Sequence, residues 1–127
     1  MSISPTARKW FLSSYKNDLN KIYTSKYYRP DESWPKTNLW WLQIPLSAID
    51  TNLHEYVNLI CQLSPNKNEF HYLKVPTKYL NEHLKKFHRI KEKISIYLSA
   101  EPAKLFKEER GEGKLDFKQF LVKDPKK

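Results

Sequence analysis

Three residues of the stretch 27 to 45, YYRPDESWPKTNLWWLQIP, have side chains that could support catalysis: Asp31, Glu32 and Lys36. A magnesium nuclease needs carboxylates that converge on one metal ion and a lysine near the scissile phosphate. Neighbouring side chains of an extended segment point to opposite sides, and a loop interrupted by Pro30 and Pro35 holds such a geometry poorly. We therefore interpret this stretch as a solvated loop before a buried strand.

Other carboxylates and glycines give no stronger indication of catalysis. Acid-x-Lys triplets, whose two ends would share one face of a strand, occur at 112–114, 116–118 and 124–126. None of them follows a strand with another inward acid, so we interpret them as solvated charge. The GEGK stretch at 111–114 lacks the upstream glycine of a phosphate-binding loop, and Leu115 stands where that motif has Ser or Thr.

The single cysteine, Cys61, alternates with apolar residues in the stretch 55–63 and is expected to be a small core residue. The four histidines, His54, His71, His83 and His88, are not spaced as zinc ligands. His83 belongs to an apolar helix face, where we expect a hydrogen-bonded histidine at the border of the core. We predict no cofactor and no metal, and the sequence leans against an enzyme.

Interleaved aromatic and basic residues are the positive functional signal. The stretch KIYTSKYYR at 21–29 and the stretch KKFHRIKEK at 85–93 combine rings that stack on bases with cations that neutralise phosphates. The alternative is that the tyrosines cover a sheet and the lysines extend over them, which requires no ligand. The candidate nucleic-acid-binding residues are Lys21, Lys26, Tyr27, Tyr28, Arg29, Trp34, Lys85, Lys86, Arg89 and Lys91.

The 127 residues suit a single domain, and Lys and Arg exceed Asp and Glu to give a formal net charge of +9. Residues 38–75 are nearly neutral, so the excess lies in the outer thirds of the chain. A field of this sign attracts nucleic acid, anionic lipid or an acidic protein, although it also keeps a protein soluble. The N-terminus lacks the apolar run of a secretion signal and no apolar stretch could span a membrane, so we expect a cytoplasmic protein without a membrane partner.

Hydrophobic periodicity predicts seven elements. Apolar residues at three- and four-residue steps indicate a helix from about Ser4-Pro5 to Ile22, followed by a long connection over 23–38. Alternation then predicts strands over 40–46, 55–63, 70–75 and 94–100, with the second half-buried and paired with the third in a hairpin. A further helix is expected over 76–87, and one or two helical turns from Pro102 to about Arg110. A C-terminal segment should dock through Leu115, Phe117, Phe120 and Leu121.

The predicted fold class is α+β, with the element order αβββαβα. Its four strands would form one mostly antiparallel sheet that carries the helices on one face.

The succession WWLQIP, EYVNLICQL and FHYLKVP, with the helix from Thr77, resembles the latter half of the PD-(D/E)XK restriction-endonuclease-like fold over residues 39–100. The resemblance implies acids before Trp40, but the stretch IYTSKYY there has Lys26 with Thr24 in the position of the acid. No catalytic residue is therefore carried over. The resemblance implies a degenerate or non-catalytic relative that is still associated with DNA.

These observations favour a small, basic, non-enzymatic module that binds nucleic acid. Two alternatives stay open: a protein-interaction protein of the immunity or inhibitor kind, in which Trp34 anchors an acidic partner, and a degenerate nuclease-like domain. A protein-interaction protein would retain its partner in a pull-down after nuclease treatment. A nuclease-like domain predicts magnesium-dependent cleavage.

Overall fold

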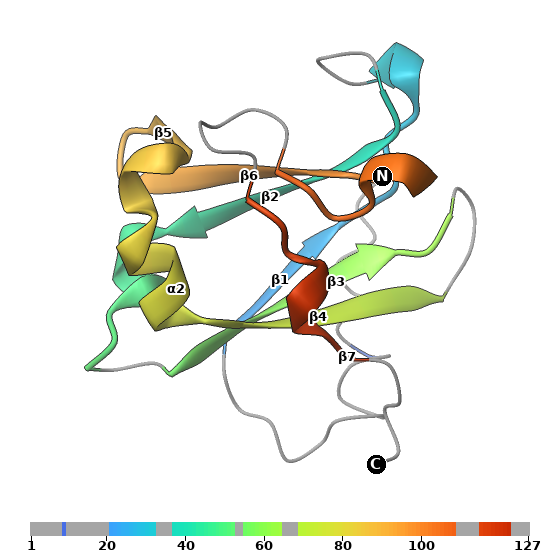
Figure 1. The fold of residues 1–127 in the computed structure, drawn as a ribbon. Coiled ribbons are helices and arrows are strands. Elements are labelled where there is room, and N and C mark those ends of the chain that lie inside the picture. Colours follow the sequence, from blue (N-terminus) through green and yellow to red (C-terminus); the bar gives the residue numbers. More distant parts are fainter. Residues whose placement is uncertain are drawn as a thin grey trace.

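The computed structural model describes residue 9 and residues 21–32, 37–52, 55–64, 69–108 and 115–122. Over these residues the chain forms two β-sheets that face each other (Figure 1). Sheet A has the strand order β1-β3-β4-β7 and sheet B the order β2-β6-β5. The elements are β1 (Lys21–Ser25), η1 (Pro30–Glu32), β2 (Leu39–Pro45), η2 (Leu46–Ile49), β3 (Tyr56–Gln62), β4 (Phe70–Pro76), α2 (Thr77–Glu82), η3 (Leu84–Lys86), β5 (His88–Ile90), β6 (Lys93–Ser99), η4 (Pro102–Lys104), η5 (Lys118–Phe120) and β7 (Leu121–Val122).

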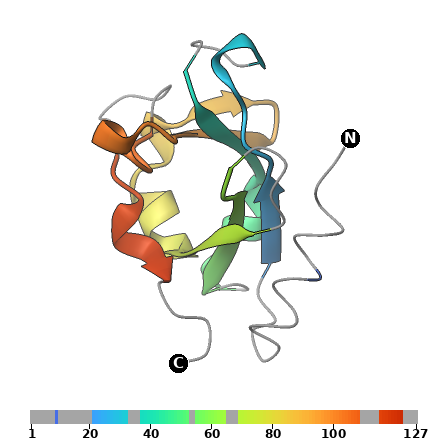
Figure 2. The same ribbon diagram turned by 90° about the vertical axis from the view of Figure 1, so that its right-hand side faces the viewer.

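The core lies between the two sheets and is built by alternation along each strand. Inward side chains of β2 and β6, among them Trp40, Leu42 and Ile96, meet those of β3 and β4, such as Leu59 and Leu73. All of them are essentially inaccessible to solvent. In the view of Figure 2 the strands and the C-terminal segment encircle this core. The α2 helix closes one end of it (Figure 1), where Leu80 is fully buried.

Two links join the edges of the sheets. On one side the chain leaves β1 and enters sheet B, where Tyr28 exchanges backbone hydrogen bonds of 2.9 and 3.0 Å with Leu39. On the other side the segment 106–108 pairs with β6 through the Leu98–Glu108 bridge and with residues 115–117 through the Lys107–Asp116 bridge. The second segment continues into β7 of sheet A.

Phe106 holds the second link in place from inside the core. Its ring stacks on Trp40 with 5.0 Å between centroids, and it is fully buried. The backbone of Phe106 has φ 64°, in the left-handed region that non-glycine residues rarely adopt. Its amide donates to the Ser99 carbonyl at 2.7 Å, and its carbonyl accepts from the Phe117 amide at 2.9 Å. These contacts offset the backbone cost of the conformation.

The predicted α+β fold class is wrong, because the described part of the chain is mostly strand, with the short helix α2 and several 3-10 turns. The strands form two sheets, and helices do not cover one face of a single four-stranded sheet. The expected order αβββαβα fails because β1 lies parallel to β3 and occupies its edge, while β2 pairs with β6 in the other sheet. β3 lies between β1 and β4 and is buried on both faces from Val57 to Gln62. The prediction of a half-buried strand is therefore also wrong.

The helix predictions are corrected at several places. Lys21 and Ile22 belong to β1, because Ile, Tyr and Thr in KIYTS favour a strand that pairs with β3. The rest of the helix predicted over 5–22 lies outside the described residues, apart from Lys9, which is helical and exposed. The second helix ends at Glu82, and a separate 3-10 turn, η3, follows it. The one or two helical turns expected over 102–110 are a single 3-10 turn, Pro102–Lys104, after which residues 107–108 form bridges beside β6 and residue 116.

The predictions for the longest strands are confirmed. β2, β3, β4 and β6 fall within one residue of the expected ranges, and β3 and β4 form the expected hairpin. The C-terminal segment docks as expected, with Phe117 fully buried and Leu115, Phe120 and Leu121 packed on the core. None of the helices in the described part of the chain is long and apolar enough to cross a membrane.

Candidate nucleic-acid interface

The candidate site is the outer face of sheet B, which points away from the core. Since Trp40, Leu42 and Ile44 are buried in the core, the alternate residues of β2 lie on the outer face. The antiparallel register places each of them opposite an outward residue of β6. The face is therefore built from the pairs Leu39 and Ser99, Trp41 and Tyr97, Gln43 and Ser95, and Pro45 and Lys93. Leu39, Ser95 and Ser99 are buried, so the accessible part of the face runs from Trp41 to Pro45, about 13 Å at about 3.3 Å per residue.

Three aromatic rings, which we name the aromatic row, lie along one end of this face: Tyr28, Trp41 and Tyr97. Tyr28 and Trp41 have 6.4 Å between centroids, and Trp41 and Tyr97 have 6.0 Å with an angle of 20° between their planes. Tyr28 and Trp41 are partly exposed, whereas Tyr97 is buried among its neighbours. The Lys26 ammonium lies 4.9 Å from the centroid of the Tyr28 ring. A cation thus lies directly beside a row of rings, as in single-strand binding sites.

The passage of the chain from sheet A to sheet B determines which tyrosine joins the row. Tyr28 lies opposite Leu39 and therefore shares its outer face. Tyr27 alternates to the inside, where its ring meets Trp40 edge-on at 5.9 Å. Its backbone amide donates to Gln62 Oε1 at 2.8 Å, and burial, with a smaller effect of Glu101, raises the pKa of its phenol. Tyr27 is therefore a packing residue.

The middle of the face holds polar atoms without hydrogen-bond partners among the described residues. Trp41 Nε1 and Ser95 Oγ are both buried and unpaired, and Ser95 is 0 % exposed. The partly exposed Gln43 lies opposite Ser95. Trp41 and Gln43 also line a cavity of about 280 Å³ together with Ile22, Tyr23 and Thr24 of β1. These two atoms have no accessible surface, so a ligand on this face can reach the amide of Gln43 but not Trp41 Nε1 or Ser95 Oγ.

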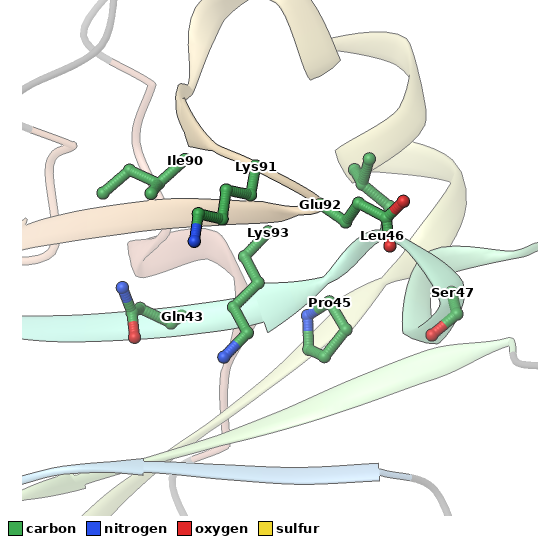
Figure 3. A pocket seen from close by; sticks show the side chains of 8 residues that line it. All are labelled: Gln43, Pro45, Leu46, Ser47, Ile90, Lys91, Glu92 and Lys93. Atoms are coloured by element: carbon green, nitrogen blue, oxygen red, sulfur yellow. The ribbon is translucent and has the colours of Figure 1, made fainter.

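The other end of the face carries a larger cavity of about 850 Å³, which we name the hairpin cavity. It lies where β2 ends beside the turn between β5 and β6 (Figure 3). Gln43 lines this cavity as well as the smaller one, so the two hollows adjoin. The hairpin cavity is lined by Gln43, Pro45, Leu46, Ser47, Ile90, Lys91, Glu92 and Lys93.

The structure brings only part of the predicted set to this face. Lys26 and Tyr28 lie at the aromatic end and Lys91 at the hairpin cavity. Arg29 is exposed just beyond Tyr28. Arg89 pairs with Ile94, a core residue, and so lies on the opposite face of β5 from Ile90.

The other predicted residues do not add to the face. Lys85 and Lys86 are exposed on η3 and line neither cavity. Lys21 begins β1, and Trp34 lies outside the described residues.

Sequence reasoning missed Trp41, Gln43 and Tyr97. The signal was present in the alternation of WWLQIP and KISIYLS, because the residues between the apolar positions must lie on the outer face. The alternation does not give the register of β2 with β6, which places Trp41 beside Tyr97.

The residues considered for catalysis do not form a site in the described part of the chain. Asp31 is exposed in the turn η1, and Lys36 and the triplets at 112–114 and 124–126 lie outside the described residues. Asp116 Oδ1 accepts from the Lys118 amide at 2.9 Å, which is a local turn. No group of three or more His, Cys, Asp or Glu side chains is found there that could hold a metal ion.

Two side chains weighed for nucleophilic or ligand roles belong to the core or its border. Cys61 is fully buried, and burial raises the pKa of its thiol, as the prediction of a core residue requires. The expectation that His83 is hydrogen-bonded is wrong for one ring nitrogen. His83 Nδ1 is buried without a partner among the described residues, and its ring packs on Tyr79 at 4.6 Å.

Comparison with known proteins found no family model, no curated protein and no solved structure that matches the chain. The resemblance of residues 39–100 to the PD-(D/E)XK fold therefore stays a prediction.

Proposed function

We propose that the protein binds single-stranded nucleic acid along the outer face of sheet B. The observation that carries the proposal is the aromatic row, with Lys26 at one end and the lysines of the hairpin cavity at the other. Rings on a sheet surface stack on bases regardless of sequence, and flanking cations pair with the phosphates. The strand would run from Tyr28 across Gln43 to Lys93.

The chemistry of the face suits a single strand. Duplex bases are stacked on each other, whereas the bases of a single strand are free to lie against Tyr28 and Trp41. The partly exposed amide of Gln43 supplies hydrogen bonds to base edges. The formal net charge of +9 adds a long-range attraction for any polyanion.

The test is the affinity of the protein for a fluorescently labelled single-stranded oligonucleotide, measured by anisotropy at several salt concentrations. If three or four phosphates are neutralised, the slope of log K against log salt is about −2 to −3. Affinity then falls roughly 20- to 50-fold between about 50 and 200 mM salt. A duplex of the same sequence should bind more weakly.

A pair of double variants separates the face from overall charge. Lys91→Ala with Lys93→Ala removes two cations of the face, and Lys74→Ala with Lys78→Ala removes two exposed cations elsewhere. The first double variant should lower the salt slope by about 1.4, at about 0.7 per lost phosphate contact. The control should leave the slope nearly unchanged. An equal decrease of the salt slope in both double variants would contradict binding at this face and would indicate general electrostatic attraction.

An acidic polypeptide serves as the competitor for the other class of partner. Displacement of the oligonucleotide by polyglutamate at matched charge would show that the face recognises charge alone and would favour an acidic protein partner. Retention of the oligonucleotide supports the role of the rings, because polyglutamate has nothing to stack on them.

A further inference from the structure

The hairpin cavity combines an apolar floor with two cations. Pro45, Leu46 and Ile90 contribute apolar surface, and Ile90 is unusually exposed for its type, at 42 %. A volume of about 850 Å³ lies within the range of small-molecule sites, about 300–1,000 Å³. The Leu46 amide donates to the Glu92 carbonyl at 2.9 Å, which ties the turn to the end of β2. The cavity is thus held between two fixed elements.

Charge is distributed unevenly around the cavity. Figure 3 shows the side chains of Lys91 and Lys93 extending toward the side of Gln43, while the Glu92 carboxylate and Ser47 lie on the opposite side. Neither lysine has an ion-pair partner among the described residues. A polyanion that follows β2 from Gln43 therefore meets two positive groups and then a negative one. Glu92 disfavours any further phosphate beyond the cavity.

Lys91 occupies a backbone position that suits glycine. It is the first residue of the two-residue turn between Ile90 and Lys93, and its φ is 55°. Positive φ at the first position of such a turn is typical of a type II′ hairpin, in which glycine is preferred. A lysine there has a backbone cost that glycine would avoid. Residues in such conformations cluster at functional sites, and Lys91 lines the cavity.

We propose that the hairpin cavity binds a phosphomonoester carried on a nucleoside. A phosphomonoester has a charge of about −1.5 to −2 at neutral pH, so it matches two ammonium groups better than an internal phosphodiester with its single charge. The apolar floor takes the attached sugar or base. This inference rests on the proposed function, because it makes the cavity the terminus of the strand-binding face. The phosphomonoester comes either from the phosphorylated end of a strand or from a free mononucleotide.

The first experiment compares one sequence in four forms: linear with a 5′-phosphate, linear with a 3′-phosphate, linear with two hydroxyl ends, and circular. The expected result is that one phosphorylated form binds about tenfold more tightly than the hydroxyl and circular forms. The preference should fade as the pH is lowered through about 6, where the phosphomonoester loses charge. Equal binding of all four forms would overturn the inference and leave the proposed function intact. Absence of binding by all four would overturn the proposed function itself.

Competition then identifies the source of the group. A nucleoside monophosphate, the corresponding nucleoside and inorganic phosphate are each titrated against the bound strand. Displacement by the monophosphate alone at low concentration assigns the free nucleotide as a ligand of the cavity. End preference without such displacement assigns the strand end. Inorganic phosphate that competes as well as the monophosphate would overturn the role given to the apolar floor.

The variant Lys91→Gly tests the cavity without harming the fold. Glycine relieves the backbone at φ 55°, so the melting temperature should be unchanged or higher, while the end preference is lost. Lys74→Ala is the matched control for charge and should retain the preference. A stable Lys91→Gly protein that still prefers phosphorylated ends would overturn the assignment of this cavity.

Discussion

The indole ring of Trp41 lies nearly parallel to the phenol ring of Tyr97, with 6.0 Å between their centroids and 20° between their planes. The two residues are directly opposite each other on β2 and β6. This stacked pair supports the ring of Tyr28 at one side, with 6.4 Å between the centroids of Tyr28 and Trp41. A base that stacks on Tyr28 would therefore meet a surface already fixed by cross-strand packing.

The aromatic row has a natural control in sheet A. Lys74 lies 4.7 Å from the ring of Tyr56, nearly the same arrangement as Lys26 over Tyr28. We expect Tyr28→Ala to weaken single-strand binding by about 1–3 kcal/mol, the usual value of one stacked base. This corresponds to roughly 5- to 140-fold in the dissociation constant. Tyr56→Ala should change affinity less than twofold, and a similar loss in both variants would argue against the row as the binding surface.

His71 should make stability depend on pH in the mildly acidic range. Its ring meets both Trp40 and Phe106 edge-on, with centroids 5.6 and 5.2 Å away, and burial lowers its pKa below the usual 6.5. Because the folded state disfavours the charged ring, the free energy of unfolding is highest above about pH 6.5 and falls as the pH drops below it. Urea unfolding from about pH 7.5 to 5 measures this fall. His71→Gln should flatten the curve, and an unchanged fall in that variant would contradict the role given to His71.

At Phe106 we expect replacement by glycine to destabilise the protein less than replacement by alanine. Removing a buried phenylalanine ring costs about 3–5 kcal/mol, and Phe106→Ala should fall in this range. Alanine keeps the cost of the left-handed backbone at φ 64°, whereas glycine removes about 1 kcal/mol of it. Phe106→Gly should therefore unfold at a higher urea concentration than Phe106→Ala. The opposite order, which is normal for an extended segment, would contradict the conformation described for this residue.

Cys61 should be chemically inert in the folded protein. The thiol is fully buried and its pKa is raised by that burial, so very little reactive thiolate exists near neutral pH. An aromatic disulfide reagent at about pH 8 should react with it only as fast as the protein unfolds. In concentrated urea the single cysteine should react at once. Rapid stoichiometric reaction without denaturant would place Cys61 outside the core.

The strands with clear alternation could be predicted from the sequence because burial on one face leaves a period of two. The stretch KIYTS could not, since Ile22 also continues the three- and four-residue spacing of the residues before it. β5 and β7 have three and two residues, too few for any period to be seen. The division into two sheets depends on pairings such as Tyr23 with Leu59, which are set by packing between distant segments.

The candidate site was predictable to the extent that it lies in one stretch of chain. Lys26 and Tyr28 are close in sequence, and their types alone suggest stacking beside a cation. The sequence does not separate Tyr27 from Tyr28, because a row of tyrosines does not show which ring turns inward. Trp41 and Tyr97 meet only through the register of β2 with β6.

The chain pairs with β3 of sheet A up to Ser25 and with Leu39 of sheet B at Tyr28. This crossing joins the two sheets into a rigid frame along that side. Ser25 Oγ accepts from the Trp41 amide at 2.9 Å and adds a second tie at the same corner. A molecule braced in this way cannot hinge open there to admit a partner. Association would therefore forfeit little conformational freedom of the backbone, and recognition would approach lock-and-key behaviour.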